Sequence, residues 1–238
     1  IADCPADITL ISNEAECEAV ANWIPPTVSD SCSGIKSFLP NYPPGTSFAL
    51  GTETVVYTAI DFSDNISTCS FTVTVNDEAP TITCIEDQIR NTNPNTCSYT
   101  VLGNEFDPVS YSDNCGIASR TYSFTDATGL RTGSNSLSGV VIERPNNIDG
   151  QLVPVEITWI VTDASNLADT CTFNLSIEDN EGPIISVPGN QIRSTDPGKN
   201  YYTIQGNEFD DVVASDACGI VIKLENTLDI LSKYIYFI

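Results

Sequence analysis

The chain has 238 residues and carries 32 acidic against 9 basic residues, so its formal net charge is −23. Such a surface excludes binding to nucleic acid, because contacts to a phosphate backbone need Lys and Arg. The chain has no histidine and no Cys-x-x-Cys pair, which excludes a Ser-His-Asp catalytic set and the usual zinc sites.

The cysteines predict a secreted protein. They are spread along the whole chain, and scattered cysteines in strand-rich sequence indicate disulfides, which persist in oxidising compartments. No apolar run reaches the roughly 18 residues of a membrane span, so we expect no membrane insertion. The nine positions are Cys4, Cys17, Cys32, Cys69, Cys84, Cys97, Cys115, Cys171 and Cys218.

The predicted elements, taken in chain order, are β-strands. Segments 54–60 and 70–75 are rich in Val, Thr, Tyr and Phe and alternate apolar with polar residues, as half-buried strands do. Segments 155–162 and 172–177 repeat that pattern, and Trp23 and Trp159 are expected in strands as core aromatics. The pattern predicts an all-β fold of small two-sheet sandwiches.

Internal repeats predict the domain organisation. Segments 88–117 and 191–220 align without a gap, 103 residues apart, and segment 57–77 recurs as 159–179. We therefore expect a first unit over 1–77, a second unit over 78–179 with an insertion at about 128–150, and a partial third unit over 180–238.

The repeats also suggest a disulfide pairing. In the third unit the positions of Cys84 and Cys97 are held by Val187 and Asn200, and cysteines that are lost together suggest a bonded pair. This gives Cys4–Cys17, Cys84–Cys97, Cys32–Cys69 and Cys115–Cys171, with Cys218 unmatched. Other pairings remain open, because spacing alone does not determine connectivity.

The first unit resembles the hyalin repeat, or HYR module. The resemblance rests on CPADITL (4–10), CEAVANWIPPTVSDSC (17–32) and GTETVVYTAIDFSDNISTCSFTVTVND (51–77). It covers the whole first unit, both ends of the second and the first half of the third. The resemblance implies tandem immunoglobulin-like domains in an extracellular or cell-surface adhesion protein. The segment 221–238 departs from the pattern.

Acidic side chains at the unit junctions suggest a calcium site. The junctions VNDEAPTI (75–82) and IEDNEGPII (177–185) look like the linkers of cadherin-type domains, and calcium takes six to eight oxygen ligands. A polar hinge is the alternative interpretation. The candidate ligands are Asp77, Glu78, Asp179, Asn180 and Glu181, with Asp61, Asp64 and Asp163 from adjacent strand ends.

Other motifs indicate modification or structure rather than catalysis. Asn65 and Asn174 begin glycosylation sequons, and the insertion is predicted to be a loop that carries sugar, contacts a partner or is disordered. The motif GNEFD, at 103–107 and 206–210, supplies Glu105, Asp107, Glu208 and Asp210, which we interpret as parts of a structural turn or of a minor metal site. We expect no enzyme activity, because no nucleophile or cofactor loop accompanies these carboxylates.

The leading hypothesis is a structural protein of a surface filament or matrix layer that associates with itself or with other surface proteins. The partial third unit and the apolar end Tyr234–Ile238 suggest head-to-tail assembly by strand addition, with a fragment of a longer array as the alternative. The second hypothesis is a monomeric adhesin stalk, or a module that binds a glycan or a receptor.

Overall fold

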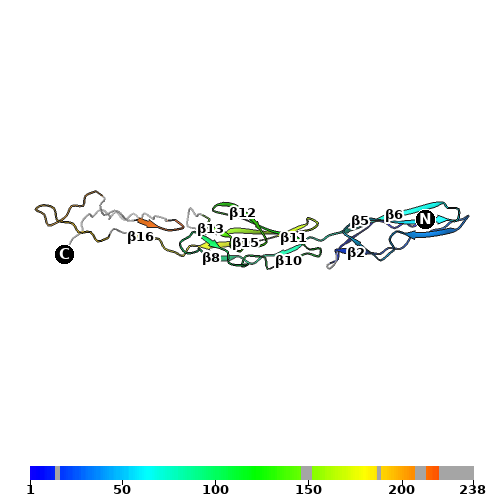
Figure 1. Cartoon of the computed structure of the whole chain (residues 1–238), viewed down its shortest axis with the longest axis horizontal. Coiled ribbons are helices and arrows are strands. Elements are labelled where there is room, and N and C mark those ends of the chain that lie inside the picture. Colours follow the sequence, from blue (N-terminus) through cyan, green and yellow to red (C-terminus); the bar gives the residue numbers. More distant parts are fainter. Residues whose placement is uncertain (14–16, 146–151, 187–188, 207–212, 220–238) are drawn as a thin grey trace.

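The protein is elongated and is built from strands. The computed structural model describes residues 1–13, 17–145, 152–186, 189–206 and 213–219. Within these ranges no residue is helical, and so no helix could span a membrane there. Figure 1 shows groups of strands that follow one another along the long axis in chain order. The predicted all-β fold is confirmed.

The first sandwich consists of strands β1 to β6. Its larger sheet has the order β1-β6-β5-β3, and β2 pairs with β4 in a smaller sheet. The predicted strands 54–60 and 70–75 lie within β5 and β6, whose alternate side chains are buried. The bounds are β1 (Ile8–Ile11), β2 (Glu18–Ala21), β3 (Ile35–Pro40), β4 (Thr46–Ala49), β5 (Gly51–Asp61) and β6 (Ile66–Asn76).

Aromatic side chains fill the first core. Trp23 lies just beyond β2 rather than in a strand, and its indole N–H donates to the hydroxyl of Tyr57 at 2.9 Å. The ring of Trp23 packs edge-on against Phe71, with centroids 5.2 Å apart. The expected core role of Trp23 is confirmed by this packing.

The second sandwich consists of strands β7 to β15. Its main sheet has the order β12-β11-β14-β15-β8, while β9 pairs with β13 and β7 with β10. Trp159 on β14 is fully buried, as expected. The bounds are β7 (Thr81–Thr83), β8 (Gln88–Asn91), β9 (Ser98–Thr100), β10 (Ser110–Ser112), β11 (Ile117–Asp126), β12 (Gly129–Ser134), β13 (Val141–Glu143), β14 (Val155–Asp163) and β15 (Ala168–Glu178).

The prediction that the insertion is a loop is wrong for its described part. Strand β12 extends the main sheet by pairing with β11, and β13 pairs with β9. The intervening Leu137 is fully buried in the second core. The ring of Tyr122 lies directly over Gly133, where any side chain would collide with it. Residues 146–150 of the insertion lie outside the described residues.

A short antiparallel pair follows the second sandwich. Strand β16 (Ile184–Ser186) pairs with β17 (Val213–Ser215), and both strands are exposed. The proposed assembly strand Tyr234–Ile238 lies outside the described residues. The boundaries 77/78 and 179/180 remain a prediction, although no strand pairing in the described chain crosses either of them.

All four predicted disulfide pairings are wrong. The structure instead contains Cys4–Cys69, Cys17–Cys115, Cys84–Cys171 and Cys97–Cys218. Cys32 is a free, exposed thiol, and Cys218 is bonded rather than unmatched.

Strand register explains the bonds within each sandwich. Strand β1 runs parallel to β6 with Ile8 opposite Val73, and the same register brings Cys4 opposite Cys69. Strand β8 likewise runs parallel to β15 and places Cys84 opposite Cys171. The extended strand then carries the chain away from this bond at about 3.3 Å per residue, so Cys17 cannot reach Cys4.

The other two bonds connect consecutive groups of strands. Cys17 lies at the far end of the first sandwich and bonds Cys115, which precedes β11 of the second sandwich. Cys97 similarly bonds Cys218, beyond β17. Cys84 and Cys97 therefore have different partners, and their joint absence from the third unit did not indicate a bond between them.

Candidate functional site

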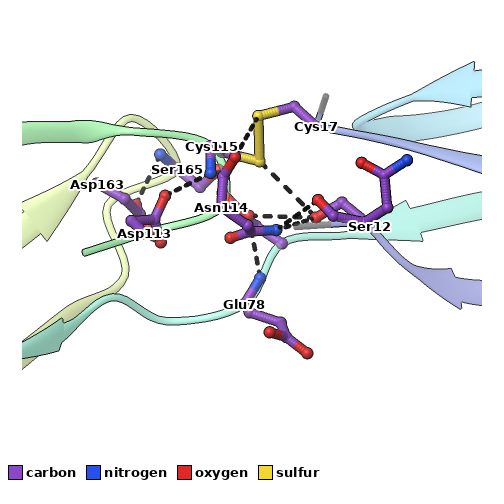
Figure 2. The surroundings of a disulfide bond; sticks show 10 residues. Ser12, Cys17, Glu78, Asp113, Asn114, Cys115, Asp163 and Ser165 are labelled. Carbon is purple, nitrogen blue, oxygen red and sulfur yellow. Dashed lines mark hydrogen bonds between the residues drawn. A yellow bond between two sulfur atoms is a disulfide. The ribbon is translucent and has the colours of Figure 1, made fainter. Parts of the chain in front are cut away.

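The candidate site is the junction between the two sandwiches. It is formed by the end of β6, the segment between β1 and β2, the turn before β11 and the loop between β14 and β15. Figure 2 shows these segments around the Cys17–Cys115 disulfide, with Ser12 on the first sandwich and Asp113, Asn114 and Asp163 on the second.

Asp77 lies at the centre of the hydrogen bonds across this junction. One of its carboxylate oxygens accepts from the Ser12 hydroxyl at 3.4 Å and from the Glu78 backbone N–H at 3.0 Å. The other accepts from the Ser165 hydroxyl at 2.5 Å, so the carboxylate connects the two sandwiches. Asn114 adds a bond from its amide nitrogen to the Ser12 hydroxyl at 2.7 Å.

Three buried oxygens at this junction have no hydrogen-bond donor. They are Oδ1 of Asp113, Oδ1 of Asn114 and Oδ2 of Asp163, and they are the only such side-chain atoms in the described part of the chain. Asp163 is 1% exposed. A buried carboxylate oxygen without a partner is costly, so the junction favours a ligand that donates to oxygen or is positively charged.

The local structure explains why Asp163 is left with a free oxygen. Its Oδ1 accepts from the backbone N–H groups of Ser165 and Leu167, both at 2.8 Å, which closes the β14–β15 loop. Both of these backbone donors bond to Oδ1, and the apolar side chain of Leu167 has no group that could donate a hydrogen bond to Oδ2.

The chemistry of these groups suits a hard cation. Oxygens of Asp77 and Asp113 lie within 4.8 Å of each other and of the Cys115 sulfur, but that sulfur is bonded to Cys17 and is not a thiolate. Asp77, Asp113 and Asp163 make no ion pair within the described residues. Carboxylate and amide oxygens are the ligands that calcium takes in proteins.

The structure brings only some of the predicted ligands together. Asp77 and Asp163 lie at this junction, whereas Figure 2 shows the carboxylate of Glu78 pointing away from the cluster. Asp113, Asn114 and Ser165 were missed by the sequence analysis. The segment Asp-x-Cys, which recurs at 30–32, 113–115 and 216–218, is the sequence signal that could have identified this turn.

Asp61 and Asp64 do not join this site, which corrects the prediction. Asp61 ends β5 and Asp64 follows it, whereas Gly51, at the start of this 11-residue strand, pairs with Val75 beside the junction. At about 3.3 Å per residue the two ends are some 33 Å apart. Asp64 forms an ion pair with Lys36 at 2.5 Å instead. The side-chain hydrogen bond from Asn65, aided by backbone N–H groups, lowers the pKa of Asp61.

A second acidic group follows the second sandwich. Asp179 and Asp216 lie close to the sulfur of Cys218, which is bonded to Cys97. The side chains of Asn180 and Glu181 turn toward the β8–β9 loop, where Asn180 donates to Asn91 at 2.7 Å and Glu181 accepts from the Asn95 backbone at 2.8 Å. Asn180 and Glu181 therefore hold this loop.

The carboxylates of the GNEFD motif are structural in its first copy. Glu105 accepts from Tyr99 at 2.6 Å and pairs with Arg90 at 2.9 Å, while Asp107 accepts from Ser136 and from the Leu137 backbone, each at 3.1 Å. Residues 103–107 form a turn, as predicted. Glu208 and Asp210 lie outside the described residues.

The two sequon asparagines differ in their surroundings. Asn65 is exposed, and its amide donates to Oδ2 of Asp61 at 2.7 Å. Asn174 lies inside β15, half-buried, and its amide donates to Asp87 at 3.3 Å. Glycosylation at either residue remains a prediction.

Comparisons with known proteins support the resemblance found in the sequence. A family model for the HYR domain matches residues 1–75. Hyalin of Strongylocentrotus purpuratus is 29% identical over 201 residues, an alignment that covers 82% of this chain. The aligned region spans 15% of the length of hyalin.

Solved structures of cadherin domains are also similar. Protocadherin Gamma B7 extracellular cadherin domains 1–4 match with a TM-score of 0.31 and 17% identity, covering 79% of this chain and 53% of that one. Drosophila N-cadherin EC1–4 matches with a TM-score of 0.30 and 12% identity, covering 72% and 47%. These TM-scores are too low to support an argument, so the fold class rests on the strands described above.

Proposed function

Because residues 1–75 match the HYR domain, we propose that the chain is a secreted, adhesion-type structural repeat protein whose units join end to end into a stiff rod. The units are 1–77, 78–179 and 180–238. The observation that carries the proposal is the junction between the first two units, where a disulfide and side-chain hydrogen bonds cross from one sandwich to the other.

The disulfides support both the secreted location and the stiffness. Four bonds among nine cysteines are typical of proteins from oxidising compartments. Domains joined only by a flexible linker generally move relative to each other. A covalent bond between Cys17 and Cys115, beside the linker near Asp77, restrains both bending and twisting.

We further propose that calcium binds at this junction. The ligands are the free oxygens of Asp113, Asn114 and Asp163, together with Asp77. A divalent cation offsets the charge of three nearby carboxylates and gives the unpartnered oxygens a ligand. Extracellular modules bind calcium with dissociation constants of about 10⁻⁴ to 10⁻³ M, and we expect a value in that range.

Calorimetry tests the calcium proposal. Titration of metal-free protein to about 10 mM calcium is expected to give a binding isotherm, and Asp163→Asn, which keeps the shape and the Oδ1 acceptor, is expected to weaken it at least tenfold. Asp64→Asn is the matched control, because Asp64 lies on the other end of the first sandwich. Equal binding by Asp163→Asn and the native chain would place the cation elsewhere.

Such rods are suited to a surface filament or a matrix layer. Negative-stain electron microscopy of the native secreted protein, with and without a calcium chelator, tests this step. Regular filaments with a periodic unit are the expected result. Separate rods that never associate would contradict assembly and favour a stalk that carries a glycan-binding or receptor-binding domain.

A further inference from the structure

One short turn occurs three times in the chain, each time with a cysteine in the same place. The sequences are Asp30-Ser31-Cys32, Asp113-Asn114-Cys115 and Asp216-Ala217-Cys218. In each turn the aspartate carboxylate accepts the backbone N–H of the cysteine, at 3.0, 2.7 and 2.8 Å. A glycine with positive φ directly follows Cys115 and Cys218, namely Gly116 and Gly219, and Gly34 follows Cys32 after one intervening residue, Ser33. The three cysteines therefore share the same aspartate-capped turn.

Two of these three cysteines are bonded, and in the same way. Cys115 bonds Cys17, and Cys218 bonds Cys97. Cys17 and Cys97 are themselves equivalent, because each immediately precedes a strand, β2 or β9. The backbone around them also agrees: Asn13 N–H donates to Glu18 at 2.8 Å and Asn93 N–H donates to Ser98 at 2.7 Å. In both cases the turn cysteine of one unit bonds the cysteine of the preceding unit that directly precedes β2 or its counterpart β9.

Cys32 occupies the same position in its turn but has no disulfide partner. It is exposed, and the other eight cysteines are all used in disulfides. Cys32 lies at the outer end of the first sandwich. This end is equivalent to the end of the second sandwich that is covered by the first sandwich. Asp61 there corresponds to Asp163, and Phe62, corresponding to Ala164, is 68% exposed. This end therefore has the thiol, the turn and an exposed apolar ring, and no unit within the described residues covers it.

We infer that Cys32 forms a disulfide with a further HYR-like unit stacked on the outer end of the first sandwich. The bonding atom on that unit is the sulfur of the counterpart of Cys17 and Cys97, the cysteine that directly precedes the strand equivalent to β2 and β9. The inference rests on the repeated bonding pattern and stands whether or not calcium binds or filaments form. The unit belongs either to the same polypeptide or to a separate one, and the chemistry is the same.

The reaction is a thiol–disulfide exchange. The thiolate of one cysteine attacks a disulfide carrier, such as glutathione disulfide or an oxidoreductase disulfide, and forms a mixed disulfide. The second thiolate displaces the carrier sulfur, so the two thiols lose two protons and two electrons while the carrier becomes two thiols. Cys32 is accessible for this reaction because it is exposed.

The native protein provides the first test. Free thiols are blocked with iodoacetamide, the protein is digested without reduction, and the peptide bonded to the Cys32 peptide is sequenced. The expected partner is a cysteine that directly precedes a strand of another HYR-like unit. If reduction lowers the apparent mass of the protein on a gel, the partner belongs to a separate polypeptide. If the apparent mass shows no such decrease, the partner belongs to the same polypeptide. Cys32 recovered with the blocking group, or bonded to a peptide outside such a unit, overturns the inference.

A built tandem provides the second test. Residues 1–80 are placed directly before residue 1 of the full chain, since Cys4 and Cys84 are 80 positions apart and this keeps the natural linker. Val20→Leu marks the upstream peptide by mass at an exposed position. Mass spectrometry is expected to find the upstream Cys17 bonded to Cys32 of the full chain, with complete loss of the free thiol at Cys32.

A matched variant controls for misfolding of the tandem. Cys32→Ser in the full chain is expected to leave the upstream Cys17 as a free thiol, while the Cys4–Cys69 bond forms in both copies and shows that both sandwiches fold. If both copies contain the Cys4–Cys69 bond and Cys32 still remains a free thiol beside a free upstream Cys17, the inference is wrong.

Discussion

The two sandwiches present the same loop at the same end, yet only one of these loops leaves a buried oxygen without a partner. In the first sandwich Asp61 closes the β5–β6 loop, and Asn65 donates to its second oxygen at 2.7 Å. In the second, Asp163 closes the β14–β15 loop in the same way, but Leu167 replaces the asparagine. Asp61 is 8% exposed and Asp163 is 1% exposed.

The difference between the two loops corresponds to whether another unit covers the loop. At the outer end, where nothing in the described chain covers the loop, the aspartate is satisfied by its own asparagine. At the junction the asparagine is absent, and Asp113, Asn114 and Asp77 contribute further oxygens. The comparison indicates that the local turn is the same in both places and that at the junction one oxygen of Asp163 is left without a donor, which is the oxygen we propose as a calcium ligand.

Removing the disulfide across the junction gives the largest expected effect. The double variant Cys17→Ser/Cys115→Ser should lose about 2–4 kcal/mol of stabilisation, since the bond closes a loop with a sequence separation of 98. It should also broaden the distribution of interatomic distances in small-angle X-ray scattering, because the two sandwiches can then bend and twist about the linker near Asp77. Cys32→Ser is the control, expected to change neither quantity.

The half-buried ion pair between Arg90 and Glu105, which belongs to the second sandwich, provides a test of the stability of that sandwich. Burial raises the pKa of Glu105, but hydrogen bonds from Tyr99, Leu102 and Arg90 outweigh it and hold the pKa below 4.5. The stabilisation is therefore present above pH 4.5 and is lost as the pH falls through the lowered pKa. Glu105→Gln should cost about 1–2 kcal/mol at pH 7 in denaturant unfolding and flatten the acid limb of the profile. An unchanged acid limb would refute this assignment.

Converting the outer loop to the junction type tests the role of Asn65. Asn65→Leu should lower the Tm of the first sandwich by several degrees in calorimetry, because Oδ2 of Asp61 loses its side-chain donor. This variant also removes a sequon, so Ser67→Ala, which removes the sequon and keeps Asn65, is the control. A Tm equal to that of the native chain would show that solvent replaces the donor fully.

Converting the junction loop to the outer type gives the smallest change in stability and the sharpest change in binding. Leu167→Asn should give Oδ2 of Asp163 a donor and stabilise the calcium-free protein by about 1 kcal/mol. Calcium affinity should fall, because this oxygen is then occupied. Titration calorimetry and thermal unfolding measure both changes, and Leu167→Ala controls for the loss of the leucine side chain. Unchanged affinity in Leu167→Asn would remove Asp163 from the site.

The sequence by itself determined the strands, the repeats and the resemblance of the first unit. Alternation of Val, Tyr and Phe predicted β5, β6, β14 and β15, because a strand with one buried face shows that period in any context. The family model over residues 1–75 agrees with the motifs that identified the HYR module. These features are local, so they can be recognised from neighbouring residues alone.

Only the tertiary structure decided the disulfide pairing and the site. Cys4 bonds Cys69 because the parallel register of β1 on β6 places them opposite each other, and sequence spacing carries no such information. Asp113 and Ser165 lie close to Asp77 only because the second sandwich is stacked on the first. Each of these contacts joins residues far apart in the chain, and their distance is determined by strand pairing and packing rather than by the neighbours of either residue.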